Sequence, residues 1–214
     1  ARIRESDRDG VGAVLELNPD SLTDAVAIDA AASSGAEGKP LWGVPVLLKD
    51  NIGTADRMHT TAGAAAMRNA RAHRDAIVVT ALRRAGAIIL GKANMSEWAF
   101  FMARHGLSGY SALGGPTRSA FGDDVVGGSS SGSAVAVALD LALVALGTET
   151  CGSIVNPASR NGVVGFKPAP DAISTEGIIP ITPAFDSVGP ITRTVDDAVA
   201  VYESLTGTPT TRPA

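Results

Sequence analysis

Residues 43–52 read GVPVLLKDNI, an apolar run that ends abruptly in polar residues. The segment 41–48 has the length and composition of a buried β-strand, and Lys49 follows at its end. Burial penalises the charged form of a lysine and lowers its pKa, and a neutral amine is a competent general base. The alternative is a surface lysine that forms an ion pair with Asp50. Lys49 is therefore the first candidate catalytic residue.

Similar apolar segments alternate with helical ones along the chain. Residues 87–90 (AIIL) again precede polar residues, Lys92 and Asn94. This alternation predicts an α/β fold. We expect a mixed β-sheet flanked by helices, in a single domain over residues 1–214. We expect strands over 41–48, 87–90 and 141–147, and helices over 75–85, over 132–139 and from the capping residue Thr194 to Leu205.

Four other segments have less regular patterns. Residues 1–35 are predicted to be helical with a break at 18–21, and residues 96–102 to form a further helix. Residues 103–132 show no periodicity and are rich in Gly, Ser and Pro, which predicts a long functional loop. Residues 208–214 (TPTTRPA) have the composition of a linker.

Two glycine- and serine-rich segments could carry chemistry. Residues 127–133 (GGSSSGS) offer several hydroxyl and backbone N–H groups, although such a sequence can also be a flexible linker. In residues 147–154 (GTETCGSI) a strand ends in a turn that can present the Ser153 hydroxyl beside backbone N–H groups, as an oxyanion hole requires. No His/Asp pair is evident to complete a Ser-His-Asp triad. Lys49 is then the available base.

Composition excludes several classes of function. The net charge is -4 and aromatic residues make up 4%, so we expect no nucleic-acid partner. The sequence contains no run of about 18 apolar residues, so no membrane span is predicted. One cysteine and three scattered histidines provide no metal site. No signal peptide is recognisable, which favours a cytoplasmic location.

These segments together resemble one family, the amidase signature hydrolases, and especially its peptide amidase branch. The resemblance extends in order over nearly the whole chain. It rests on the stretches GVPVLLKDNI (43–52), AGAIILGKANMSEWA (85–99), GGSSSGSAVAVAL (127–139), GTETCGSIVNPASRNGVVGFKP (147–168) and GIIPITPAFDSVGPITRTVDDA (177–198).

The resemblance implies hydrolysis of a carboxylic amide through a Ser-Ser-Lys triad and an acyl-enzyme, without metal or cofactor. Ser153 corresponds to the nucleophile, Ser129, at a non-proline cis peptide bond, to the bridging serine, and Lys49 to the base. Small-molecule amides or C-terminal peptide amides are the implied substrates, with carboxylate and ammonia or an amine as products. The implied oxyanion hole consists of the backbone N–H groups of Thr150, Cys151, Gly152 and Ser153.

Length is the main departure from the family, whose members are about twice as long. We expect this chain to lack the family's C-terminal half, which would leave a sheet edge exposed and favour self-association as a homo-oligomer. Two other functions stay open. One is a component of a glutamine-dependent amidotransferase, and the other is a non-catalytic, truncated amidase-like domain.

Overall fold

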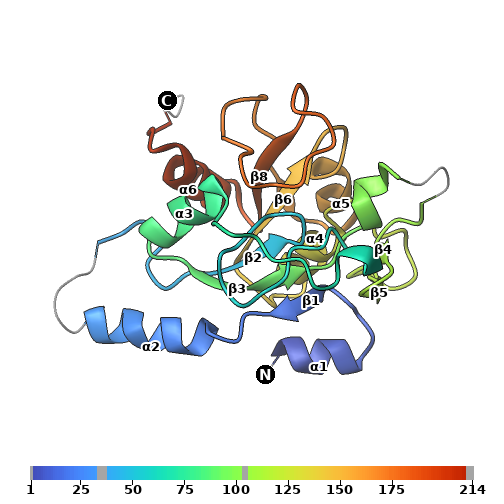
Figure 1. Cartoon of the computed structure of the whole chain (residues 1–214), viewed down its shortest axis with the longest axis horizontal. Helices are drawn as coiled ribbons and strands as arrows, with labels where there is room; N and C mark the ends of the chain where they lie inside the picture. Colours follow the sequence, from blue (N-terminus) through green and yellow to red (C-terminus); the bar gives the residue numbers. More distant parts are fainter. Residues whose placement is uncertain (1, 33–37, 103–105, 211–214) are drawn as a thin grey trace.

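The computed structural model describes residues 2–32, 38–102 and 106–210, and a six-stranded mixed sheet runs through it (Figure 1). The central strands run parallel to one another, and each outer strand pairs antiparallel with its neighbour. The prediction of a mixed sheet is confirmed. The strand order is β1 (Val14–Leu17), β3 (Ile88–Ala93), β2 (Pro45–Lys49), β6 (Val144–Glu149), β8 (Ser187–Thr192) and β7 (Val164–Gly165).

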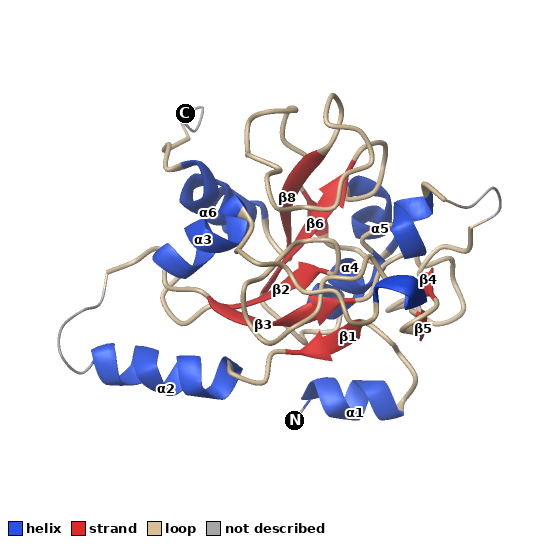
Figure 2. Ribbon diagram, in the orientation of Figure 1, coloured by secondary structure: helices blue, strands red, loops and turns tan. Residues whose placement is uncertain are grey.

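Figure 2 shows α3 (Ile77–Arg84) and α6 (Val195–Thr206) side by side, apart from α4 (Ser131–Ala138). One apolar cluster joins α3 and α6 to one face, and a second joins the alanine-rich α4 to the other. The predicted flanking helices are therefore present. The helices are α1 (Arg2–Arg8), α2 (Ser21–Ala32), α3 (Ile77–Arg84), α4 (Ser131–Ala138), α5 (Val155–Arg160) and α6 (Val195–Thr206).

The alternation of side chains along β2 decides where its last residue points. Val46 and Leu48 belong to the cluster with α3 and α6, whereas Leu47 belongs to the cluster with α4. Successive side chains of a strand point to opposite faces, so Lys49 lies on the same face as Leu47. The sequence pattern therefore directs the lysine toward the beginning of α4.

A glycine lets that helix begin close to the strand ends. A Cβ atom at Gly132 would lie 2.2 Å from the carbonyl oxygen of Ala13 and 2.5 Å from that of Asn94. The backbone N–H of Gly132 instead donates to the Asn94 carbonyl at 2.9 Å. Any side chain here would push the N-terminus of α4 away from the sheet.

The helical prediction for residues 1–35 is confirmed at α1 and at α2, which begins at Ser21, but it is wrong between them, and the helix predicted over 96–102 is wrong. Residues 14–17, inside the predicted helix 1–35, form β1, because backbone pairing with β3 outweighs local propensity. Residues 96–102 contain only the 3₁₀ turn η2 (Glu97–Phe100), in which Trp98 and Ala99 have positive φ. Phe100 also has positive φ, and three consecutive residues in this region cannot continue a right-handed helix.

The structure also contains strands that the sequence analysis did not predict. The long loop before α4 contains a short hairpin of β4 (Tyr110–Ser111) and β5 (Gly115–Pro116), and no strand was predicted where β8 lies. Thr194 caps α6 by accepting a hydrogen bond from Asp197 N–H, as expected. Parts of three predicted segments, at 33–35, 103–105 and 211–214, lie outside the described residues.

We expect Leu47→Ala to lower the free energy of unfolding by about 2–5 kcal/mol, because it empties a fully buried site between the sheet and α4. The matched control is Leu22→Ala on α2, where the side chain is 80% exposed and the change should stay within about 0.5 kcal/mol. Urea unfolding of both variants measures the difference. Equal losses would contradict the assignment of Leu47 to the core.

Candidate active site

Lys49 lies at the centre of a buried polar cluster. It is fully buried at the end of β2, and its Nζ donates to Ser129 Oγ at 2.7 Å and to the carbonyl oxygen of Thr148 at 3.0 Å. The alternative of a surface ion pair with Asp50 is wrong, since Asp50 is itself buried and accepts from Thr61 and from Gly63 N–H. The amine therefore bridges the beginning of α4 and strand β6.

The surroundings of this amine change its protonation. Burial lowers the pKa of Lys49 from 10.5 to about 7, although the negative charges of Glu149 and Asp186 oppose this shift. Above about pH 7 the amine is mainly neutral and can accept a proton. The site can therefore hold a general base at physiological pH without a histidine.

Ser129 is fixed by the loop that leads into α4. The Gly128–Ser129 peptide bond is cis, as the resemblance implies, and the Ser129 side chain is fully buried. The Ser129 carbonyl accepts from Ser96 N–H at 3.1 Å, and the next residue, Ser130, donates its N–H to the Ser153 carbonyl at 3.0 Å. This loop is therefore an ordered part of the site, not the flexible linker that its composition also allowed.

A single carboxylate organises the turn that follows β6. Glu149 accepts hydrogen bonds from the N–H groups of Gly152 (2.7 Å), Ile154 (2.6 Å) and Val155 (2.9 Å). Charged acceptors make strong hydrogen bonds to N–H groups, so the turn is held tightly at the start of α5. The N–H of Gly152, one of four predicted for the oxyanion hole, is therefore already engaged.

Ser153 lies at the edge of a pocket beside this turn. Its side chain is 6% exposed and lines the pocket, whereas the neighbouring Cys151 is exposed. The structure joins Lys49 to Ser129 directly, but among the described residues no hydrogen bond joins the Ser153 hydroxyl to Ser129. The three predicted triad residues therefore lie in one region. Of the two hydrogen bonds that would connect them, the one between Lys49 and Ser129 is formed.

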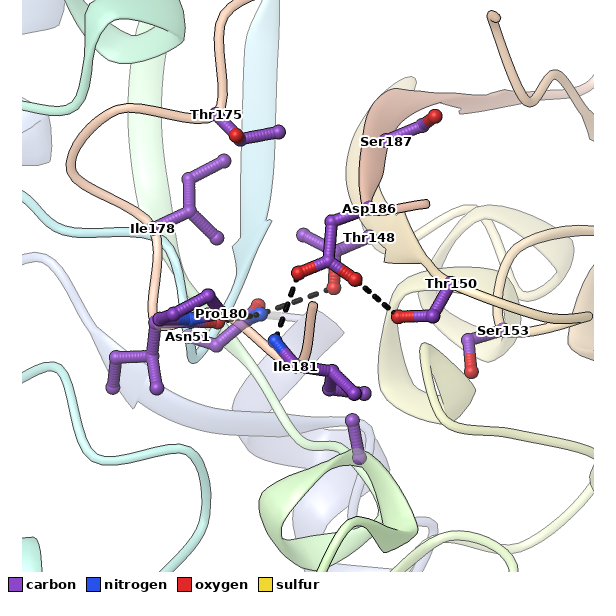
Figure 3. A pocket seen from close by; sticks show the side chains of 12 residues that line it. Asn51, Thr148, Thr150, Ser153, Thr175, Ile178, Pro180, Ile181, Asp186 and Ser187 are labelled. Carbon is purple, nitrogen blue, oxygen red and sulfur yellow. Dashed lines mark hydrogen bonds between the residues drawn. The ribbon is translucent and has the colours of Figure 1, made fainter. Parts of the chain in front are cut away.

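The pocket is bounded by the turn on one side and by a loop before β8 on the other (Figure 3). Asp186 lies between them, and it accepts hydrogen bonds from the Thr150 hydroxyl and from Ile181 N–H. The sequence analysis missed Asp186. Its signal was a lone acidic residue directly before a short apolar run, DSVGPI (186–191). The other lining residues are mostly apolar or hydroxylic: Ala99, Thr148, Thr175, Ile178, Ile179, Pro180 and Ser187, with Asn51.

A second buried lysine shows that burial alone does not identify the base. Lys92 at the end of β3 donates to the Ile52 carbonyl (2.6 Å) and to Thr60 Oγ1 (3.0 Å). Burial lowers the pKa of Lys92 to about 8, and the charge of Asp50 opposes the shift most strongly. No serine of the candidate triad contacts it within the described chain. We therefore assign Lys92 a structural role, in which it holds the loop after β2 against the sheet.

The described ranges contain neither a membrane-spanning helix nor a metal-binding cluster. No helix there is long and apolar enough to cross a membrane. Within the same ranges, no group of three His, Cys, Asp or Glu side chains is arranged to hold a metal ion.

Comparison with known proteins gives consistent matches. A family model described as Amidase matches residues 1–213. The crystal structure of native peptide amidase from Stenotrophomonas maltophilia has a TM-score of 0.91 and 47% sequence identity, and the match covers 99% of this chain and 46% of that chain.

Two sequence relatives extend the comparison. A putative amidase of Schizosaccharomyces pombe is 49% identical over 198 residues, which are 92% of this chain and 34% of the relative. A glutamyl-tRNA(Gln) amidotransferase subunit of Symbiobacterium thermophilum is 42% identical over 200 residues, which are 92% of this chain and 40% of the relative. The chain therefore spans less than half the length of each.

We expect Glu149→Gln to lower the free energy of unfolding by about 1–3 kcal/mol, because an amide can accept through only one oxygen and would leave buried N–H groups of the turn unpaired. The matched control is Glu176→Gln, which disrupts an exposed ion pair with Arg74 and should cost less than about 1 kcal/mol. Thermal and urea unfolding measure both. A Glu149 variant as stable as the control would contradict the role assigned to this carboxylate.

Proposed function

Because the chain belongs to the amidase family, we propose that it hydrolyses a carboxylic amide, with Ser153 as nucleophile, Ser129 as proton relay and Lys49 as base. The observation that carries the proposal is the 2.7 Å hydrogen bond from Lys49 Nζ to Ser129 Oγ in a fully buried site. A lysine with a pKa of about 7 exists in both protonation states near neutrality, as a group that takes up and returns a proton must.

The proposed reaction needs no group outside the amide, water and these side chains. Neutral Lys49 takes the proton of Ser129 while Ser129 takes that of Ser153, and the Ser153 oxygen forms a bond to the carbonyl carbon. The C–N bond then breaks, and the relay returns the proton to the leaving nitrogen. Water then gives a proton to the same relay while its oxygen bonds to the acyl carbon, the bond from that carbon to the Ser153 oxygen breaks, and the relay returns the proton to Ser153 as the carboxylate leaves.

The negative charge on the carbonyl oxygen needs donors that are already in place. We assign this role to backbone N–H groups of the turn that follows Glu149. Since Gly152 N–H donates to Glu149, the donors proposed to be available are those of Thr150, Cys151 and Ser153. Only the backbone of Cys151 is proposed to take part, because its exposed side chain does not line the pocket.

The pocket disfavours an amide substrate that carries a carboxylate. Asp186 is the ionisable side chain among its lining residues, and no lysine or arginine of the described chain lines it to bind a substrate carboxylate. An apolar wall of Ile178, Ile179, Pro180 and Ile181 suits an apolar acyl group. These features, with the likeness to a peptide amidase, support C-terminal peptide amides as the first substrates to test.

A second candidate is the release of ammonia from glutamine within an amidotransferase. The 42% identity to a glutamyl-tRNA(Gln) amidotransferase subunit motivates it. Ammonia release from peptide amides, fatty amides and glutamine separates the candidates. Turnover of glutamine alone would favour the amidotransferase, and release from none of the three would favour a non-catalytic domain.

Ser153→Ala should abolish labelling by a fluorophosphonate and reduce amide hydrolysis by at least about 10³-fold, because no covalent intermediate can form. Mass spectrometry of the labelled wild type should place the adduct on Ser153. Ser204→Ala on α6 is the control and should be labelled normally. An adduct on another serine, or full activity of the Ser153 variant, would disprove the assignment.

Lys49→Met should fold, because methionine preserves the packing of the aliphatic stem, yet remain inactive. In the wild type the labelling rate should rise with pH around a midpoint of about 7, since the lowered pKa makes the amine neutral above this pH. The exposed Lys39 provides the control: Lys39→Met should keep the rate and its pH profile. Wild-type rates in the Lys49 variant would show that another group is the base.

A further inference from the structure

We propose that Asp186 is a positioning residue whose carboxylate holds the turn of residues 150–153 against the wall of the pocket. The proposal rests on the proposed function, because it concerns how the oxyanion turn and the substrate wall are kept in a fixed relation. It assigns a role to a residue that neither the triad nor the proposed oxyanion hole includes.

The two oxygens of this carboxylate contact two different segments. Oδ1 accepts a hydrogen bond from the hydroxyl of Thr150, the first residue of the turn. Oδ2 accepts from the N–H groups of Ile181 (2.8 Å) and Thr182 (3.0 Å), which belong to the loop that forms the wall. Hydrogen bonds to a charged acceptor are short and directional, so this carboxylate couples the positions of the turn and the wall (Figure 3).

The sheet determines why Asp186 lies there. β6 and β8 pair antiparallel with Glu149 opposite Ser187, so the next residue of one strand and the preceding residue of the other also face each other. The loop before β8 folds back on itself, because the N–H groups of Phe185 and Asp186 both donate to the Thr182 carbonyl. The carboxylate is thereby held above the wall that it contacts.

The charge of Asp186 also reaches the proposed base. Lys49 on β2 faces two carboxylates, Glu149 at the end of β6 and Asp186 before β8, and both favour its protonated form. In Asp186→Asn the amide oxygen can still accept from Ile181 and Thr182, and the amide nitrogen can donate to the Thr150 hydroxyl, so the loss of the charge should make the Lys49 amine easier to deprotonate. An uncharged residue at this position would leave the pH dependence of labelling unchanged, so the pH midpoint reports the charge of Asp186, and the labelling rate of Thr150→Val reports its contact with the turn.

Two variants separate the contact from the charge. Thr150→Val removes the hydroxyl but keeps the shape and the carboxylate, so the fluorophosphonate labelling rate should fall roughly 10- to 100-fold with its pH midpoint unchanged. Asp186→Asn keeps the shape and removes the charge, so the midpoint should move to lower pH. Asp124→Asn, in an exposed loop, is the charge control and should change neither quantity. Thermal unfolding of each variant verifies that it is folded.

The outcomes distinguish this inference from the proposed function. An unlabelled wild type, or labelling that survives Ser153→Ala, would overturn the proposed function. If the wild type is labelled on Ser153, then an unchanged rate in Thr150→Val or an unchanged midpoint in Asp186→Asn would overturn the role of Asp186 alone. As a second measurement, the pKa of the Lys49 amine, followed by nuclear magnetic resonance of ¹⁵N-labelled lysine, should fall in Asp186→Asn even without turnover.

Discussion

The hydrogen bond between the buried amine of Lys49 and the Ser129 hydroxyl is the interaction around which the rest of the site is arranged. A charged ammonium without a close anionic partner is costly to bury, and a neutral amine is tolerated where its N–H groups find acceptors. Here these acceptors are a hydroxyl and the Thr148 carbonyl, which come from two elements far from β2 in sequence. The amine therefore requires the beginning of α4 and the end of β6 to meet at the end of β2.

The comparison with Lys92 shows what makes this amine suitable for chemistry. Both lysines lie at the ends of parallel strands, both are buried, and nearby carboxylates oppose the deprotonation of both. The difference is in their partners: the amine of Lys92 contacts a carbonyl and a threonine, whereas that of Lys49 contacts Ser129. Lys49 lies on the opposite side, where the serine-rich loop begins α4. Because side chains alternate along a strand, Leu47 and Lys49 lie on that face, and a shift of one residue in β2 would turn the proposed base away from Ser129.

The sequence predicted the elements whose pattern is local. The apolar runs before Lys49 and Lys92 identified β2 and β3, and the capping residue Thr194 identified the start of α6. The sequence failed where pairing across the sheet decides the structure: residues 14–17 became an edge strand, and the strand at 187–192 was not predicted. Asp186 was missed for the same reason, because its partner Thr150 lies 36 residues earlier and the two meet only through the pairing of β6 with β8.

Because the pairing of β6 with β8 brings the turn and the wall together, substrate selection and the rate of reaction are coupled. The turn that would bind the developing oxyanion and the wall that would contact the acyl group are joined by the carboxylate of Asp186. Substitutions in the wall that move the N–H groups of Ile181 or Thr182 would therefore also move Thr150. Because oxyanion donors are effective only at a defined distance from the reacting atom, a reshaped wall would alter the rate of reaction as well as the choice of substrate. Substitutions that change selectivity with the smallest loss of rate are therefore expected at Ile178 and Pro180, wall residues whose backbones form no hydrogen bond with Asp186.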